Sequence, residues 1–436
     1  MKPDTRGLFV RMFGGAVIDQ ALLSASSLAV GLLLIRHASE LQYGYFVLVT
    51  SVLVLMTSLQ SSFIGPAMIN RMTTLDRDSR GALTGGIYRE QRRWIHLMAL
   101  AAATGTAVLW INGVLDRQTG PLVLVTIGTA AATLRREFFR MVLLAYRRSP
   151  EVLKADSAYV VLLVGGVLAT SVMPSPAAAT TVLLGLSALI GGSLLKGLLR
   201  SREAWDPMGE PGILRRIAPV GAWAVTGAVI HWSYSHGYNY LVAGTLDVAA
   251  IAAIAATRLL LMPINLLSTG IGALMLPLTS AWLHTLGAAT VLRRLTLFAV
   301  GVAAAALVYL CALWLMRDWV FTTVLNKQFE HGDALLLVWS CVFVLMVMRD
   351  QLIYLLVARQ RFRTLAALSA FSAVLSLTAS YAGMQHFGVI GAPLGLLVGE
   401  ALSITGIVLL SLRELARPVP AAVCAAPGEA LDPHAG

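Results

Sequence analysis

Charged residues occupy the middle of a long apolar stretch. Four of them interrupt the otherwise hydrophobic segment 121–148: Arg135, Arg136, Glu137 and Arg140. At about 1.5 Å per residue, this segment would cross a bilayer core of roughly 30 Å with its charges just past midway. A charge at that depth costs roughly 3 kcal/mol or more unless it faces protein or water. These residues therefore predict a buried ion-pair network or a polar pathway through a membrane.

The second half of the chain repeats this arrangement. A shift of 213 residues places Arg349 on Arg136 and Asp350 on Glu137, inside another apolar stretch. A weaker match, at a shift of 207 residues, aligns earlier parts of the two halves. Two halves that each carry a charged pair at similar depth are typical of a transporter built from two repeats around a polar pathway.

The composition excludes an ordinary soluble globule. Of the 436 residues 57% are hydrophobic and only 13% charged, and the mean hydropathy is +0.76. The three cysteines have no metal-ligand spacing, and the chain has no phosphate-binding loop or nucleophile motif. We therefore expect no metal, no cofactor, no catalytic residue and no enzymatic activity. The net charge of +11 is spread over short loops, as membrane orientation requires, so we expect no nucleic-acid partner.

Twelve apolar runs are long enough to cross a membrane, and they predict an all-α polytopic membrane protein. They lie at residues 14–35, 43–69, 94–115, 120–146, 157–173, 178–199, 217–244, 248–279, 295–316, 333–358, 364–383 and 388–412. We expect two six-helix bundles related by the repeat, at residues 1–202 and 203–416. The segment 417–436, rich in Pro and Ala, is expected to be a disordered cytoplasmic tail.

Loop charges predict the orientation of these spans. One side carries 24 of the 33 basic residues, whereas the opposite loops carry only Arg36, Arg117, Arg317 and Lys327. Because Lys and Arg accumulate in cytoplasmic loops, the first side is predicted to be cytoplasmic, and both termini lie there.

The remaining five basic residues lie within the predicted spans, where an anionic ligand would complement them. They are Arg135, Arg136, Arg140, Arg258 and Arg349. The alternative is that each acidic neighbour satisfies a basic one and fixes the helix within its own half. Three polar residues, His231, His236 and Asn239, belong to the aromatic segment H-W-S-Y-S-H-G-Y-N-Y. This segment suits sugar rings or, alternatively, an aromatic belt at the membrane interface.

Four acids within the spans are candidates for coupling transport to a proton or a cation. They are Asp19, Glu137, Asp350 and Glu400. For Glu400, which lies in a glycine-rich run, a packing hydrogen bond is the alternative role.

Four short segments carry a resemblance to a known family. They are D-Q-A-L-L-S-A-S-S-L-A-V-G-L-L-L-I-R from residue 19, Y-G-Y-F-V-L-V-T from residue 43, S-F-I-G-P-A-M from residue 62 and F-G-V-I-G-A-P-L-G-L-L-V-G-E from residue 387. With them the chain resembles the polysaccharide-exporting flippases of the multidrug/oligosaccharidyl-lipid/polysaccharide superfamily. The resemblance implies two six-helix bundles around a central cavity that opens alternately to each side of the bacterial inner membrane.

In that family the implied cargo is an undecaprenyl-pyrophosphate-linked oligosaccharide for polymers such as O-antigen or exopolysaccharide. A proton or sodium gradient is the implied driving force, and the implied partners include membrane lipid, a polysaccharide polymerase and chain-length proteins. By position, the resemblance assigns the lumen arginines that hold pyrophosphate or acidic sugars to Arg136, Arg140, Arg258 and Arg349.

Three other functions compete with this interpretation. A cation-coupled drug antiporter of the same superfamily would need an acidic cavity, whereas five arginines face four acids within the predicted spans. A peptidoglycan-precursor flippase usually has fourteen helices, compared with the twelve predicted here. A membrane-embedded polysaccharide polymerase or ligase would need a large external loop, and the predicted outside loops are short.

Overall fold

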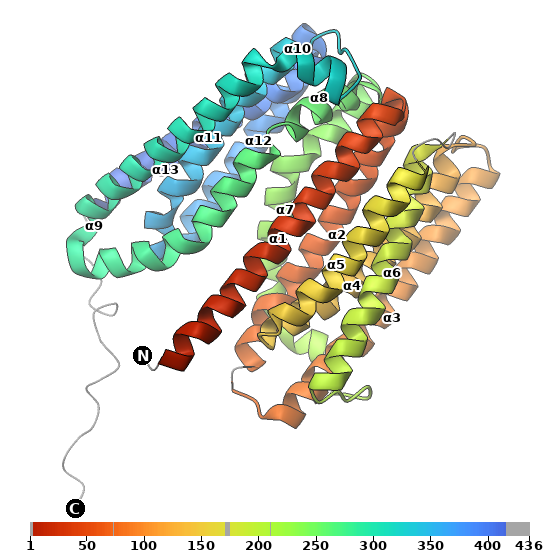
Figure 1. The fold of residues 1–436 in the computed structure, drawn as a ribbon, viewed down its shortest axis with the longest axis vertical. Helices are drawn as coiled ribbons and strands as arrows, with labels where there is room; N and C mark the ends of the chain where they lie inside the picture. Colours follow the sequence, from red (N-terminus) through yellow and green to blue (C-terminus); the bar gives the residue numbers. More distant parts are fainter. Residues whose placement is uncertain (1–2, 73, 171–174, 210, 416–436) are drawn as a thin grey trace, which may run out of the picture.

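The structure of the chain is a computed structural model that describes residues 3–72, 74–170, 175–209 and 211–415. The described residues are almost entirely helical and contain no strand (Figure 1). In a bilayer no water satisfies backbone N–H and C=O groups, so a helix, which pairs them internally, is the expected spanning element. The predicted all-α class is confirmed. The predicted tail at 417–436 lies outside the described residues.

Six helices form the N-terminal half. They are α1 (Pro3–His37), α2 (Glu40–Met72), α3 (Arg77–Ile111), α4 (Thr119–Ala145), α5 (Ser149–Thr170) and α6 (Pro176–Arg202). Short connections force neighbouring helices to run antiparallel. Only two residues separate α1 from α2, and Arg147, with a left-handed φ of 59°, turns the chain between α4 and α5.

The C-terminal half has more breaks. It contains α7 (Ile213–Thr245), α8 (Ala250–Leu259), α9 (Met262–Leu315), α10 (Arg317–Trp319), the π-helical turn η1 (Val320–Val324), α11 (Gly332–Ala358), α12 (Phe362–Phe387), the 3-10 turn η2 (Gly388–Ile390) and α13 (Gly391–Leu415). The long helix α9 is interrupted at Gly287, whose φ of 75° and ψ of 162° are not helical. Glycine adopts such a positive φ without steric cost.

The described helices supply twelve spans, as predicted. By length and composition alone, nine described segments can cross a membrane, or ten if α8 and the start of α9 form one bent span. That count joins α12 and α13 into one segment and omits α4, which carries four charges. Ten segments, counting the bent span, become twelve when α12 is separated from α13 and α4 is added. The kink at Gly287 divides α9 between the eighth and ninth of these spans.

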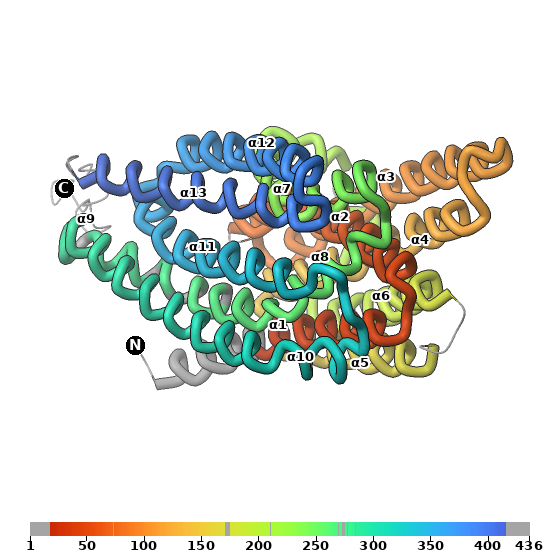
Figure 2. Tube along the Cα trace, turned by 90° about the horizontal axis from the view of Figure 1, so that it is seen from above, coloured from red at the N-terminus to blue at the C-terminus, as the bar shows by residue number. Residues whose placement is uncertain are grey.

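The helices are arranged in two lobes. In the N-lobe, α4 packs against α6, α2 and α3, and α5 packs against α1 and α6; in the C-lobe, α11 packs against α9 and α13, and α13 against α12. The chain enters and leaves at the same end of the molecule, called here the terminal end (Figure 1). The lobes converge at the opposite end, the far end, where α8 and α10 lie. Figure 2 shows α2, α7 and α8 in the middle, between the two lobes.

Glycines bring the two lobes together near the far end. Gly44, close to the start of α2, lies against the backbone carbonyl of Val248, and a Cβ at Gly44 would come within 2.0 Å of that oxygen. Gly31 of α1 lies in the same way against the side chain of Leu259 in α8. Small residues permit this close approach of helices in membranes, where packing rather than the hydrophobic effect drives association.

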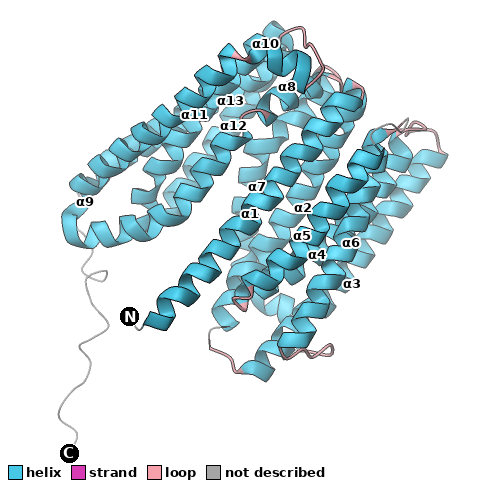
Figure 3. Cartoon of the chain, viewed as in Figure 1, coloured by secondary structure: helices cyan, strands magenta, loops and turns pink. Residues whose placement is uncertain are grey.

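The loop between the lobes, described at residues 203–209 and 211–212, is held on α3 at the terminal end (Figure 3). Gly85 leaves room for the carbonyl of Asp206, to which a Cβ would come within 1.7 Å. One turn further along α3, the carboxylate of Glu90 accepts hydrogen bonds from the backbone N–H of Gly212 and of the second residue of α7. This carboxylate therefore caps the start of α7 from the other lobe.

Replacement of Gly44 by alanine tests the contact between the lobes. We expect Gly44→Ala to lower stability, because overpacking against a backbone carbonyl costs about 1–3 kcal/mol. The measurement is the midpoint of thermal unfolding of the purified protein in detergent. Gly128→Ala is the matched control: nothing lies within 4 Å of that position, so the better helix former should raise the midpoint slightly. An unchanged midpoint for Gly44→Ala would contradict the close approach.

Candidate functional site

A network of five charged side chains lies inside the N-lobe. Arg136 donates to Asp156 over 2.5 Å, and Arg140 donates to the other oxygen of Asp156 over 2.9 Å. Arg140 also bonds Asp19 over 2.6 Å and Glu137 over 3.3 Å. The network joins α1, α4 and α5, so it ties three helices together where hydrocarbon alone would give them little reason to associate.

The sequence of α4 creates this network by placing unlike residues on different faces. Arg136 and Arg140 are four residues apart and share one face, whereas Phe138 and Phe139 are fully buried in the apolar core of the lobe. The guanidinium of Arg136 also lies 3.8 Å from the ring centroid of Tyr159 on α5. A planar guanidinium stacks on an aromatic ring in this way, whereas the ammonium group of a lysine would not, so lysine would be a poor replacement for Arg136.

The C-lobe contains a second, smaller network. Arg349 of α11 bonds its neighbour Asp350 and Glu400 of α13, each over 2.8 Å. Asp350 also accepts a hydrogen bond of 3.2 Å from Ser268 of α9. A cavity of about 300 Å³ lies beside this network, and His231 and the charged pair of α11 are among its lining residues.

The two networks share an unusual property. Each contains one more carboxylate than arginine: Asp19, Glu137 and Asp156 against two arginines in the N-lobe, and two acids against Arg349 in the C-lobe. In each, one carboxylate oxygen is buried without a hydrogen-bond partner among the described residues. These oxygens are Oδ1 of Asp19 and Oε2 of Glu400. An ionised carboxylate buried in this way is costly, so a proton or a small cation would stabilise either one.

Arg258 is held differently from the other predicted arginines. Its Nη1 donates to the carbonyl of Ser235 over 2.9 Å and to the hydroxyl of Tyr238 over 3.0 Å. Its guanidinium lies 5.4 Å from the ring of Trp339. Among the described residues no carboxylate contacts it, and the next residue, Leu259, touches α1 of the opposite lobe. Arg258 is therefore a half-buried cation beside the lobe interface that keeps hydrogen-bonding capacity.

Arg135 lies apart from all of these residues. It donates to Ser193 of α6 over 3.2 Å and lines a cavity between α3, α4 and α6. The five predicted arginines are thus divided among four places: the N-lobe network, the C-lobe network, the edge of the lobe interface and the outer side of the N-lobe.

The aromatic segment of α7 serves two purposes. Asn239 donates to the hydroxyl of Ser51 on α2 over 3.1 Å, and Trp232 donates to the carbonyl of the same residue over 2.8 Å. These groups join the lobes. His236 feels the charge of Arg258, whereas His231 lines the cavity beside Arg349 and Asp350. The structure therefore separates the two histidines between these places and takes Asn239 into the contact between α2 and α7.

Asp156 is a site residue that the sequence prediction missed. It lies one residue before the predicted fifth span, where it is fully buried and bonds two arginines. The signal that could have revealed it is charge balance: α4 carries three arginines and one glutamate, so another helix had to supply an acid at that depth.

Replacement of Asp156 by asparagine tests the N-lobe network. Breaking a buried pair by removing one partner costs roughly 3–5 kcal/mol, so Asp156→Asn should greatly lower the thermal midpoint. Adding Arg136→Gln should recover part of the loss, because it removes the charge left unpaired. The control is Asp333→Asn, whose exposed pair with Arg317 contributes about 0–1 kcal/mol. Equal midpoints for the two single variants would show that the network is not structural.

Comparisons with known proteins give the fold. No protein-family model matches the chain, and no curated protein matches its sequence. Among solved structures, a lipid II flippase MurJ in an inward closed conformation matches with a TM-score of 0.75, over 91% of this chain and 87% of that chain, at 10% identity. An inward-facing multidrug resistance MATE transporter matches with a TM-score of 0.68, over 89% and 93%, at 13% identity.

A third match is a transporter of the MOP superfamily from Pyrococcus furiosus, described as having a binding pocket of reverse polarity. Its TM-score is 0.64, over 94% of this chain and 96% of that chain, at 14% identity. All three neighbours are named as transporters or flippases, and at 10–14% identity the likeness to them is one of fold. The chain is thus a multi-pass membrane protein that shares its fold with these transporters and flippases.

Proposed function

We propose that the protein moves an undecaprenyl-pyrophosphate-linked oligosaccharide from the cytoplasmic to the outer leaflet of a bacterial inner membrane. The observation that carries this proposal is Arg258, a cation beside the lobe interface with no carboxylate partner among the described residues. A pyrophosphate is anionic and strongly hydrated, and a guanidinium can replace part of its water shell. His236, which feels the charge of the same cation, would add a hydrogen-bonding group for a phosphate or a sugar.

The acids argue against the rival drug antiporter. A cationic drug requires an accessible carboxylate, but the intramembrane acids pair with arginines inside the lobes. The two carboxylates with a free oxygen, Asp19 and Glu400, have side chains that are only 1% and 3% exposed. A proton or a bare sodium ion fits beside such a group, whereas a bulky organic cation does not. Asp350 is more accessible, with a side chain 31% exposed beside a cavity, but Arg349 balances its charge.

The orientation follows from the positive charges. The terminal end carries most of the basic loop residues, so we propose that it faces the cytoplasm and that both termini lie there. With that orientation, the lobes in Figure 1 meet on the outer side and diverge toward the cytoplasm. We further propose that the bundles 1–202 and 203–416 rock against each other, so that Arg258 faces each side in turn.

Gradient coupling is assigned to the carboxylates, with Asp19 and Glu400 as the first candidates and Glu137 and Asp350 as their network neighbours. Each lobe can take up one proton or cation without separating an arginine from all its partners. The lobe with an ion bound and the lobe without one would therefore favour different packings of the helices that the network joins.

The cargo proposal is tested by deletion and complementation in the host bacterium. Loss of the gene should cause a lipid-linked saccharide to accumulate, and its mass, measured in extracted membranes, identifies the cargo. Complementation with Arg258→Gln should restore little export, since losing hydrogen bonds to a charged group costs about 1.5–3 kcal/mol, roughly a tenfold to hundredfold effect. Arg317→Gln, which changes a half-buried arginine near the far end, should restore it fully.

Two outcomes would contradict the cargo proposal. A lipid-linked pool that stays unchanged in the deletion strain would remove its basis. Full export by Arg258→Gln would show that this cation does not hold the anionic headgroup.

The coupling proposal is tested in vesicles that contain the purified protein. An imposed proton or sodium gradient should accelerate flipping of a fluorescent polyprenyl-pyrophosphate-linked sugar by the unmodified protein. Glu400→Gln and Asp19→Asn should flip at the rate seen without a gradient, because an amide neither takes up a proton nor attracts a cation as a carboxylate does. Glu40→Gln, an exposed acid at the start of α2, should respond normally. A full gradient response in both variants would refute the assignment.

A further inference from the structure

The N-lobe has a cluster of cations on the side away from the C-lobe. A cavity of about 350 Å³ between α3, α4 and α6 is lined by Arg92, Arg135 and Lys196. The ring of Tyr88 lies between two of them, 5.9 Å from the guanidinium carbon of Arg92 and 5.5 Å from Nζ of Lys196. No acidic side chain is among the described residues that line this cavity. Three like charges around one space repel one another, so an anion there would be stabilising.

Nearby acids are occupied elsewhere. Glu90 of α3 accepts backbone hydrogen bonds from the start of α7, and Glu137 of α4 bonds Arg140. Arg135 has one described acceptor, the hydroxyl of Ser193, and its Nε is buried without a partner. The counter-charge of this cavity must therefore come from outside the described residues.

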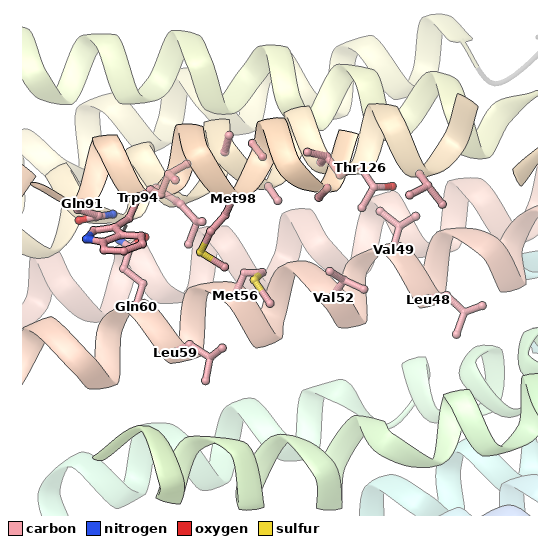
Figure 4. Close-up of a pocket in the computed structure, with 18 of the residues that line it drawn as sticks. Leu48, Val49, Val52, Met56, Leu59, Gln60, Gln91, Trp94, Met98 and Thr126 are labelled. Atoms are coloured by element: carbon pink, nitrogen blue, oxygen red, sulfur yellow. Dashed lines mark hydrogen bonds between the residues drawn. The ribbon is translucent and has the colours of Figure 1, made fainter. Parts of the chain in front are cut away.

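An apolar groove of about 870 Å³ adjoins the charged cavity. It runs between α2, α3, α4 and α7, and the two spaces share Gln91, Ile95 and Ala131 as lining residues. Figure 4 shows Val52 and Met56 of α2 and Met98 of α3 along it, with Gln60, Gln91 and Trp94 gathered at one end. Along α4 the groove extends from Leu134 to Thr119, fifteen residues or about 22 Å, which exceeds the depth of one leaflet, roughly 15 Å.

The shared end of the two spaces has a polar group without a partner. Gln91 is 7% exposed, and its Oε1 has no hydrogen-bond donor among the described residues. An oxygen in this position accepts a hydrogen bond from a hydroxyl. The ligand therefore needs an anionic group for the cations, a hydroxyl for Gln91 and a long apolar chain for the groove.

We propose that this place binds an anionic phospholipid with a hydroxylated headgroup, such as phosphatidylglycerol, from the leaflet at the terminal end. The phosphate lies among the three cations, the headgroup hydroxyl donates to Gln91, and an acyl chain fills the groove. Trp94, 61% exposed beside Arg92, is the type of residue that favours the interface between headgroups and hydrocarbon. The site lies on α3, α4 and α6, away from Arg258, so it is separate from the proposed cargo site.

This lipid has a mechanical role. In the N-lobe, α3 packs mainly against α4, and spaces remain on both sides between α3 and the helices α2 and α6. A lipid in these spaces completes the packing of α3. Because α3 also holds the loop between the lobes, the lipid stabilises the attachment of that loop.

The test is a titration of the purified protein in detergent with phosphatidylglycerol, followed by native mass spectrometry. The triple variant Arg92→Gln, Arg135→Gln, Lys196→Gln should bind at least tenfold more weakly than the unmodified protein. The control triple variant Arg93→Gln, Arg200→Gln, Arg215→Gln removes the same charge from exposed positions of α3, α6 and α7 and should bind normally. Ala131→Phe, which fills the junction, should weaken binding while all three cations remain. Phosphatidylcholine should bind poorly to every form.

Three results would overturn the proposal: equal phosphatidylglycerol affinity in both triple variants, equal affinity for phosphatidylcholine, or preferential binding of undecaprenyl phosphate at the three cations. The last would assign the site to the carrier lipid. If the triple variant does not fold, Lys196→Gln alone should still reduce the affinity measurably. All these readouts are binding, so they remain valid whether or not the protein flips a lipid-linked sugar.

Discussion

Neutralising charge inside the membrane is the constraint on which this structure depends. An arginine in a spanning helix is stabilised by polar partners at the same depth, and Arg136 and Arg140 find acids on two other helices, at Asp156 and Asp19. The arrangement of α1, α4 and α5 follows from that requirement. Apolar side chains could not specify it as sharply, because lipid tails compete with them on nearly equal terms. The same logic operates in the C-lobe, around Arg349.

The charge networks also separate structure from transport. Paired arginines hold helices, and the few polar groups that remain unpaired are free for ligands and ions. Arg258 and Arg135 have no carboxylate partner among the described residues, and Asp19 and Glu400 each keep one oxygen without a hydrogen bond while the other bonds an arginine. Of the alternatives raised by the sequence, ion pairing describes Arg136, Arg140 and Arg349, and the binding of an anionic ligand stays a proposal for the others.

Much of the fold could be predicted from the sequence, because each helix that crosses a bilayer needs an apolar run long enough to span it, and such runs are visible in the sequence. The site was harder to predict. Spacing along α4 shows that Arg136 and Arg140 share a face, but it does not show that Asp156 of another helix lies opposite them. Likewise, the composition around Asn239 suits a sugar as well as a protein neighbour, and only the three-dimensional packing reveals Ser51 beside it. Partners across helices are set by tertiary structure, which local pattern does not contain.

The attachment of the interlobe loop to α3 has a kinematic consequence. Because Glu90 accepts hydrogen bonds from the backbone at Gly212, the loop moves together with the N-lobe. Relative rotation of the lobes is then concentrated where α7 begins. Helix α7 then acts as a lever 33 residues long, about 50 Å, with its fulcrum near the terminal end. A rotation of a few degrees at that fulcrum displaces the opposite end of α7 by several ångströms, the scale on which the contact between Gly44 and Val248, just beyond that end, would part.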